Sequence, residues 1–150
     1  MAHPDKDRVV ECINDIIEAV QSVAEFEQRV ATVFDEEDAM NQLKGLARWP
    51  AAVVQYEGMK AVEGQQAGNW PNAATLIMSI LVVNQGQRLI KTDTKVSTLL
   101  LLTQLRKTLL GRTAPSGHKW KFVVEAAASE KNGLIFWVQR WQCNLVFQPD

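Results

Sequence analysis

The sequence predicts a single α+β domain in which helices pack against a mostly antiparallel β-sheet. Two segments carry the period of an amphipathic helix, several short apolar runs are typical of strands, and an Asn-Gly pair joins two long extended runs near the C-terminus. With 150 residues the chain is long enough for one hydrophobic core, and no linker, repeat or low-complexity tract divides it. We therefore expect one domain over residues 1–150.

The first third predicts a helix, a strand and a second helix. Apolar residues three and four positions apart predict a helix over Asp5–Val23, with Asp7 in its first turn. The short β-branched run Arg29–Phe34 predicts a strand. Carboxylates at the start of Asp35–Leu46 favour a helix N-terminus, and they need no metal ion there.

The middle of the chain predicts two strands joined by a long loop. Ala51–Tyr56 follows a proline and is β-branched, whereas Ala73–Asn84 is almost continuously apolar, which indicates a strand covered on both faces. The segment between them, Glu57–Asn72, is rich in glycine and polar residues and predicts a loop or an extended hairpin tip.

The last third predicts a helix followed by a hairpin. A leucine stripe places the helix over Thr94–Leu110, with Asp93 or Thr94 as its cap and Gly111 in the position that ends it. The runs Trp120–Ala127 and Leu134–Phe147 predict the two strands of the hairpin.

The strand over Leu134–Phe147 alternates between an apolar and a polar face. Trp137 and Trp141 share the apolar face with Ile135, so we expect them in the core. Arg140, Gln142 and Asn144 lie on the polar face and are the candidate subunit-interface residues. Because this strand is unusually long, we expect its far end to project or bend and the strand to offer an unpaired edge to a second subunit.

No residue pattern supports catalysis, a metal site or a cofactor site. His3 lies in a polar tail and His118 in a predicted turn, and neither belongs to a nucleophile–base pattern. Metal-ligand spacings and phosphate-binding loops are absent from the sequence. Cys12 and Cys143 are interpreted as small buried hydrophobes. We expect a protein that is not an enzyme.

Charge and hydropathy narrow the class of protein further. The formal net charge of −1 argues against binding to the phosphate backbone as the main role, although basic residues are frequent in the second half. They could line a DNA passage, but an ordinary charged face is the favoured interpretation. Because we find no signal peptide and no apolar run of membrane-spanning length, we expect the protein in a reducing cytoplasm.

Five tryptophans in a chain of this size suggest a binding surface, because tryptophan is enriched at interface hot spots. Trp70 lies in the predicted loop beside Pro71, and Lys60 lies in the same loop. These three residues are the candidate contacts with a partner.

Four segments, taken in order, resemble the tail terminator, or tail completion, proteins of Mu-like bacteriophages. Leu46–Gly58 resembles the Pro-led strand of that family, and Leu76–Asn84 resembles its second strand. A leucine-rich helix over Val96–Gly111 and a closing hairpin that ends at Cys143–Gln148 follow. The polar connection Gln85–Lys91 lacks the glycine- and arginine-rich character of the family. The resemblance spans residues 5–148.

The resemblance implies a structural virion protein at the head-proximal end of the phage tail, assembled in the host cytoplasm. It implies a ring of identical subunits, usually a hexamer, seated on the last ring of the tail tube. Such a ring stops tube polymerisation and joins to head–tail connector or neck proteins, and DNA passes through its lumen without sequence-specific contacts. Within this role, the predicted loop at Glu57–Asn72 is expected to reach toward the tube.

Three alternatives stay open from the sequence. A head–tail connector or neck protein has the same need for a ring around DNA. A small ligand-binding or enzymatic α+β domain would need a pocket with convergent polar groups, and no residue set predicts one. A nucleic-acid-binding module would show strongly salt-dependent DNA binding.

Overall fold

The computed structural model describes residues 7–33, 50–62, 72–85, 97–131 and 133–147. These residues form a five-stranded sheet with two α-helices and one short 3₁₀ helix, which confirms the predicted α+β class. The predicted helix over Asp35–Leu46 lies outside the described residues.

The sheet has the spatial order β1-β2-β3-β5-β4. Its strands are β1 (Val30–Val33), β2 (Ala51–Ala61), β3 (Asn72–Gln85), β4 (Lys121–Lys131) and β5 (Leu134–Phe147). Only β1 and β2 pair in parallel, and the other neighbours are antiparallel. The mostly antiparallel character of the sheet is therefore confirmed.

Both α-helices begin at a side-chain cap. Asp7 caps α1 (Arg8–Gln21) by accepting a hydrogen bond from the Val9 N–H at 2.8 Å. Ser97 caps α3 (Thr98–Leu109) in the same way through the Leu100 N–H at 3.1 Å. Both helices are shorter than predicted at their start, because each cap residue lies inside the range that the apolar stripe suggested.

Gly111 directly follows the end of α3, as predicted. The C-cap Leu110 is already extended, and Gly111, with a φ of +80°, takes the third position of a turn that the Arg112 N–H closes on the Leu109 carbonyl oxygen at 3.1 Å, where glycine has no steric cost. After the first helix the chain makes a short 3₁₀ turn, η2 (Ala24–Phe26), and enters β1.

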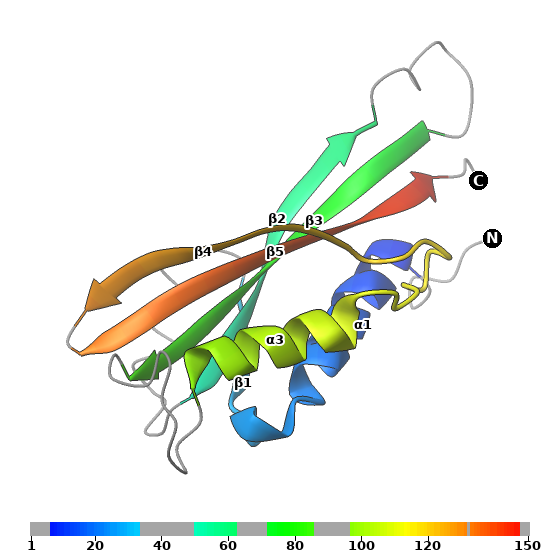
Figure 1. Cartoon of the computed structure of the whole chain (residues 1–150). Coiled ribbons are helices and arrows are strands. Elements are labelled where there is room, and N and C mark those ends of the chain that lie inside the picture. The colour runs from blue at the N-terminus through cyan, green and yellow to red at the C-terminus, as the bar shows by residue number, and fades with distance from the viewer. Residues whose placement is uncertain (1–6, 34–49, 63–71, 86–96, 132, 148–150) are drawn as a thin grey trace.

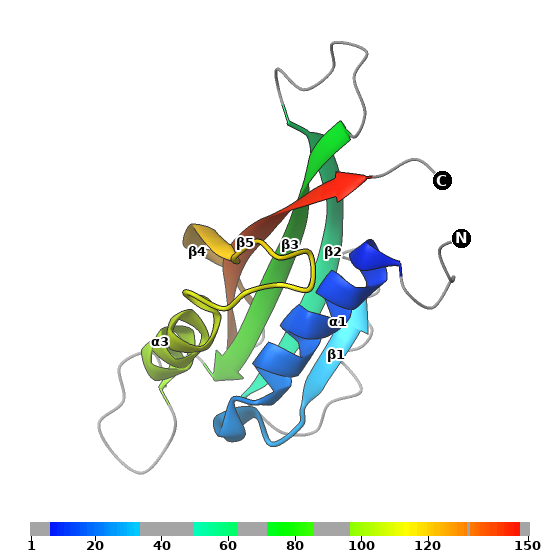
Figure 2. The same cartoon turned by 90° about the vertical axis from the view of Figure 1, so that its right-hand side faces the viewer.

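Both helices cover the same face of the sheet (Figures 1 and 2). We call it the helix face and the opposite one the outer face. Helix α1 contacts β1 and β2, α3 contacts β3, and the two helices also contact each other. The main core lies between these layers, and it includes Ile16, Ile80, Leu105 and Trp141.

The outer face carries a second, smaller apolar cluster. Val53, Val83 and Phe136 are buried there, with Leu81 and Leu134 packed against them. The almost continuous burial of β3 from Met78 to Asn84 follows from the two clusters together, and it confirms the prediction that this strand is covered on both faces.

Of the two alternatives predicted for Glu57–Asn72, the extended hairpin is confirmed at its start and the loop is wrong there, because Glu57–Ala61 continue β2 as strand beside β3. Lys60 pairs with Thr75 in this extension, so it lies on a strand and not on a loop. A β-bulge beside Gly58, whose φ is +113°, lets the pairing continue past a polar stretch. The β2–β3 hairpin rises beyond the helical layer (Figure 2).

Strand β5 lies inside the sheet, between β3 and β4. The expected unpaired edge on this strand is therefore wrong for Leu134–Gln142, where both neighbours pair with it. Its far end, from Cys143 to Phe147, continues to pair with β3, and among the described strands none pairs with its other side, so an unpaired edge is found there. Within the described residues, the outermost strands are β1 and β4.

Candidate assembly surfaces

Strand β4 is the longer of the two outermost strands and is exposed on both of its faces. Among the described residues it pairs with β5 alone. Phe122, Val123 and Val124 are 37–44% exposed, and three exposed alanines follow Glu125. A long apolar outer strand is a template for pairing with another chain, and proteins that stay monomeric usually protect such an edge.

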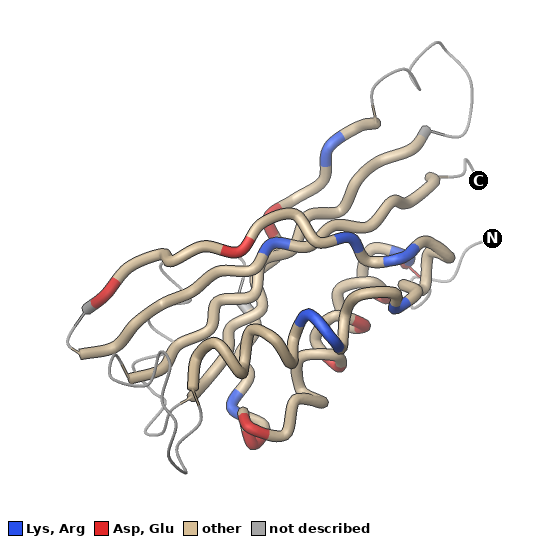
Figure 3. Tube along the Cα trace, viewed as in Figure 1, with Lys and Arg blue, Asp and Glu red and all other residues tan. Residues whose placement is uncertain are grey.

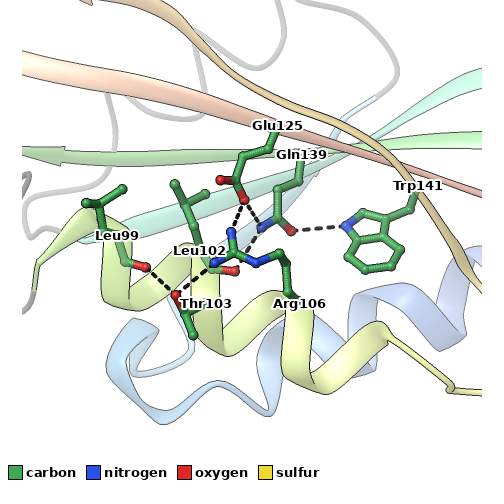
Figure 4. A network of polar contacts seen from close by, with 7 residues as sticks. All are labelled: Leu99, Leu102, Thr103, Arg106, Glu125, Gln139 and Trp141. Atoms are coloured by element: carbon green, nitrogen blue, oxygen red, sulfur yellow. Dashed lines mark hydrogen bonds and ion pairs between the residues drawn. The ribbon is translucent and has the colours of Figure 1, made fainter.

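A polar network fixes β4 to the rest of the fold (Figure 4). The Glu125 carboxylate forms an ion pair with Arg106 of α3 and accepts a hydrogen bond from Gln139 Nε2 at 2.8 Å. Gln139 Nε2 also donates to the Leu102 carbonyl oxygen, and Trp141 Nε1 donates to Gln139 Oε1 at 3.0 Å. The network therefore ties α3, β4 and β5 together.

An aromatic contact anchors the start of the same strand. Phe122 and Trp141 meet edge to face, with ring centroids 5.5 Å apart. The contact with Trp141 fixes the position of the Phe122 ring. The Phe122 side chain is still 41% exposed, so a partner can contact it. The ring contact and the polar network thus tie the first half of β4 to the core, and a surface ordered in advance has a lower entropy cost of docking a partner.

The connection from α3 to β4 is held to the first helix. Asp15 on α1 accepts hydrogen bonds from Arg112 Nη2 at 3.0 Å and from Trp120 Nε1 at 2.9 Å. Ser116 Oγ donates to the Asn144 carbonyl oxygen at 2.8 Å. His118 is exposed in this connection, where a turn was predicted.

Arg140, Gln142 and Asn144 lie together on the outer face, as the alternation of the strand predicts. Arg140 Nε donates to Glu57 Oε2 at 2.6 Å, and Thr75 Oγ1 donates to Asn144 Oδ1 at 3.1 Å. All three are half-buried within one chain. Their role at a subunit interface stays a prediction.

The ion pair on the outer face changes the titration of its carboxylate. Burial alone would raise the pKa of Glu57, but the hydrogen bond and the positive charge of Arg140 outweigh it. The pKa of Glu57 therefore lies below its ordinary value of 4.5.

Lys60 is exposed on the β2–β3 hairpin, near the end that rises beyond the helices. Trp70 and Pro71 lie outside the described residues. Of the three predicted partner contacts, the structure therefore describes Lys60 alone, and Lys60 lies on β2 and not on β4. The sequence did not predict the exposed surface formed by Phe122–Val124. The run Phe-Val-Val, in a strand that leads to a polar hairpin turn, is the pattern that could have indicated it.

Cys12 on α1 and Cys143 on β5 are both free and fully buried in the main core, as the sequence suggested. The neighbouring Cys12 thiol and burial together raise the pKa of Cys143, so this thiol stays protonated. Within the described ranges, no cluster of three His, Cys, Asp or Glu residues is placed to hold a metal ion. None of the described helices has the length and apolar character needed to span a membrane.

Charge is divided between the two ends of the described chain (Figure 3). Residues 7–33, which form α1 and β1, carry six acidic and two basic side chains, a net charge of −4. Residues 97–131, which form α3 and β4, carry six basic and two acidic side chains, a net charge of +4. The balanced total of the chain therefore hides an unequal distribution of charge between these two parts of the chain.

Comparison with known proteins gives a match at the level of structure. No family model matches the sequence, and no curated protein matches it. Among solved structures, the chain is similar to one from the virion of a native gene transfer agent particle, with a TM-score of 0.58 and 10% sequence identity. The alignment covers 91% of this chain and 92% of the other, so the likeness extends over the whole fold.

Proposed function

We propose that this protein is a structural component of a phage-like virion, not an enzyme. The observation that carries the proposal is the likeness of the whole fold to a chain of a gene transfer agent virion. The exposed apolar edge of β4 supports it as well, because a subunit of an assembly needs a surface that a partner can cover.

Within that class, we propose the role of a tail terminator. Copies of the chain would form a closed ring, a hexamer by analogy, at the head-proximal end of the tail tube. The ring would end tube polymerisation and present a surface to head–tail connector or neck proteins. DNA would pass through its lumen without sequence-specific binding. The ordered resemblance of the strands, the leucine-rich helix and the closing hairpin to tail terminators supports this finer assignment.

The β2–β3 hairpin is the part proposed to meet the tail tube. It rises beyond the helical layer, and it carries Lys60 as well as the connection that contains Trp70 and Pro71. A projecting hairpin can reach a neighbouring protein without disturbing the core, and tryptophan is a frequent anchor in such contacts.

Electron microscopy of particles made without this protein tests the role. A terminator predicts overlong or irregular tails, because nothing stops polymerisation of the tube. A neck protein predicts tails of normal length that fail to join heads. Complementation with the wild-type chain restores normal particles in either case. Normal particles in the absence of the protein would contradict both roles.

The partner contact is tested in the same system with Trp70→Ala and Lys60→Ala. We expect Trp70→Ala to give particles that resemble those lacking the protein, while the variant still folds and self-assembles. Val10→Ala, at an exposed position of α1 and not on the hairpin, is the control and should complement fully. Full complementation by both hairpin variants would contradict the proposed tube contact.

A further inference from the structure

We propose that copies of this chain join head to tail along the sheet, with β4 of one copy pairing antiparallel with β1 of the next. This inference rests on the proposed ring and names the surfaces that form it. The occupant of the exposed β4 edge is thus a second copy of the chain.

Strand directions make this geometry possible. Strands β1 and β2 run in the same direction, and each step from β2 to β3, to β5 and to β4 reverses it. Strand β4 therefore runs opposite to β1. A second copy placed beside β4 in the same orientation presents its β1 antiparallel, so one sheet can continue from copy to copy with the regular hydrogen-bond ladder of an antiparallel pair.

Charge favours this arrangement over a twofold one. The exposed cations Lys119 and Lys121 lie at the start of β4 and Lys107 lies on α3, whereas the exposed anion Glu18 lies on α1 and Glu27, which pairs with Arg29, precedes β1. Further along, β4 carries Glu125, Glu130 and Lys131, so its positive charge is concentrated at its start. A head-to-tail contact brings the two unlike ends together. A twofold contact between two β4 strands would not bring these cations and anions together.

The apolar side chains fit the same contact. Phe122, Val123 and Val124 surround the start of the β4 edge, and Leu99 and Leu100 are exposed on the neighbouring helix α3. Because both helices lie on the same face, with α3 toward the β4 end and α1 toward the β1 end (Figure 2), joining the sheets also brings α3 of one copy toward α1 of the next. The contact would therefore cover both the strand edge and the exposed leucines.

Cysteine cross-linking tests the pairing directly. Thr32→Cys on β1 and Ala127→Cys on β4 both replace exposed side chains that lie on the helix face. We expect a short bis-maleimide to link the two variants when they are mixed, and to link neither variant to itself. The buried Cys12 and Cys143 leave the wild type unlinked, which is the control for background.

A lysine placed on the edge gives an independent readout. Val124→Lys adds a charge to the exposed edge and should weaken self-association about tenfold or more, because that charge would be buried at the contact. Val146→Lys is the matched control, since Val146 is similarly exposed at 44% and lies at the far end of β5. Circular dichroism should show that both variants remain folded.

The outcomes separate this inference from the proposed function. Rings of wild-type protein with no mixed cross-link, or with Ala127→Cys linked to itself, would overturn the head-to-tail pairing and leave the ring in place. Equal self-association of Val124→Lys and Val146→Lys would also overturn it. If the wild-type chain stays monomeric both in solution and in the presence of tail tubes, the proposed ring and the proposed pairing are both contradicted.

Discussion

Gln139 is a fully buried amide that bonds to three separate parts of the fold. Its Nε2 donates to the Leu102 carbonyl oxygen of α3 and to Glu125 of β4, and its Oε1 accepts from Trp141. A buried polar group with every bond satisfied specifies one arrangement of its neighbours, because any other arrangement leaves an unpaired donor or acceptor. Here it sets the position of β4 relative to α3.

Replacing this amide should destabilise the protein. In Gln139→Leu the Trp141 indole N–H loses its acceptor in the core, and we expect a loss of about 1–3 kcal/mol in the free energy of unfolding. Urea denaturation followed by tryptophan fluorescence measures it. Gln142→Leu, the same change at a half-buried position of the same strand, should cost much less. Equal losses in the two variants would contradict the role given to the network.

The Glu57–Arg140 ion pair predicts a pH dependence of stability. The carboxyl group of Glu57 has a folded-state pKa below its ordinary value of 4.5. The pair therefore contributes stability above that pH, and the contribution is lost as the pH falls through the lower folded-state pKa. The advantage of wild type over Glu57→Gln should be largest above pH 4.5 and should shrink in more acidic buffer.

Denaturation of both proteins across an acidic pH series checks this. Arg140→Gln removes the partner that lowers the pKa, so it should weaken the acid dependence of the Glu57 contribution. A difference between wild type and Glu57→Gln that stays constant down to strong acid would contradict the assignment.

Alternation alone was enough to place Arg140, Gln142 and Asn144 on one face of their strand. The partner of Arg140 was beyond the sequence, because Glu57 belongs to a different strand and lies beside a bulge at Gly58. Pairing between distant residues depends on strand order and register, and neither is encoded in local spacing.

The end of α3 makes a prediction at the scale of an element. Gly111 has a φ of +80°, and apart from its two chain neighbours no atom lies within 4 Å of the position that a Cβ would occupy. Gly111→Ala therefore introduces no clash, and its cost is the backbone strain of the left-handed conformation, about 1–2 kcal/mol. Thermal denaturation should show a lowered midpoint. Gly111→Asn should lose less, because asparagine tolerates this conformation, and an equal loss would point to a different cause.

The helices and the inner strands were predictable because their apolar faces repeat with a clear period. Strands β2 and β4 extend several residues further than their patterns indicated. Past a bulge in each strand, Gly58–Ala61 pair with β3 and Ser129–Lys131 pair with β5. The side chains of Met59, Lys60, Ser129 and Glu130 are exposed, so these strand ends carry little hydrophobic pattern. A strand end that is held by its neighbour's backbone leaves no local signal for the sequence to show.

The position of β5 was not predictable for a related reason. Its length and its polar face suggested an outer strand. An inner strand of a sheet with helices on one face shows the same alternation, however, since from Gln139 to Leu145 only the residues on that face are fully buried. The order of strands is a property of the whole molecule. Because β4 lies outside β5 in that order, the candidate edge for pairing with another subunit is on β4 instead of β5.

The division of charge between the two ends of the molecule predicts a salt effect on assembly. If unlike ends meet, added salt should weaken self-association, since exposed charges are screened over about 10 Å at 0.1 M ionic strength. Sedimentation velocity at low and high salt measures it. A purely apolar contact would instead be unchanged or strengthened by salt. Lys119→Glu combined with Lys121→Glu should remove most of the salt dependence and much of the association.

The two buried thiols can report how often the helical layer opens away from the sheet. Cys12 belongs to α1 and Cys143 to β5, so a thiol reagent can reach them only when the helix lifts away from the sheet. The rate of labelling in native buffer therefore measures how often the helical layer opens. In a ring, the labelling rate should be lower than in the free subunit. A neighbouring subunit packed against α1 would make the same opening less frequent.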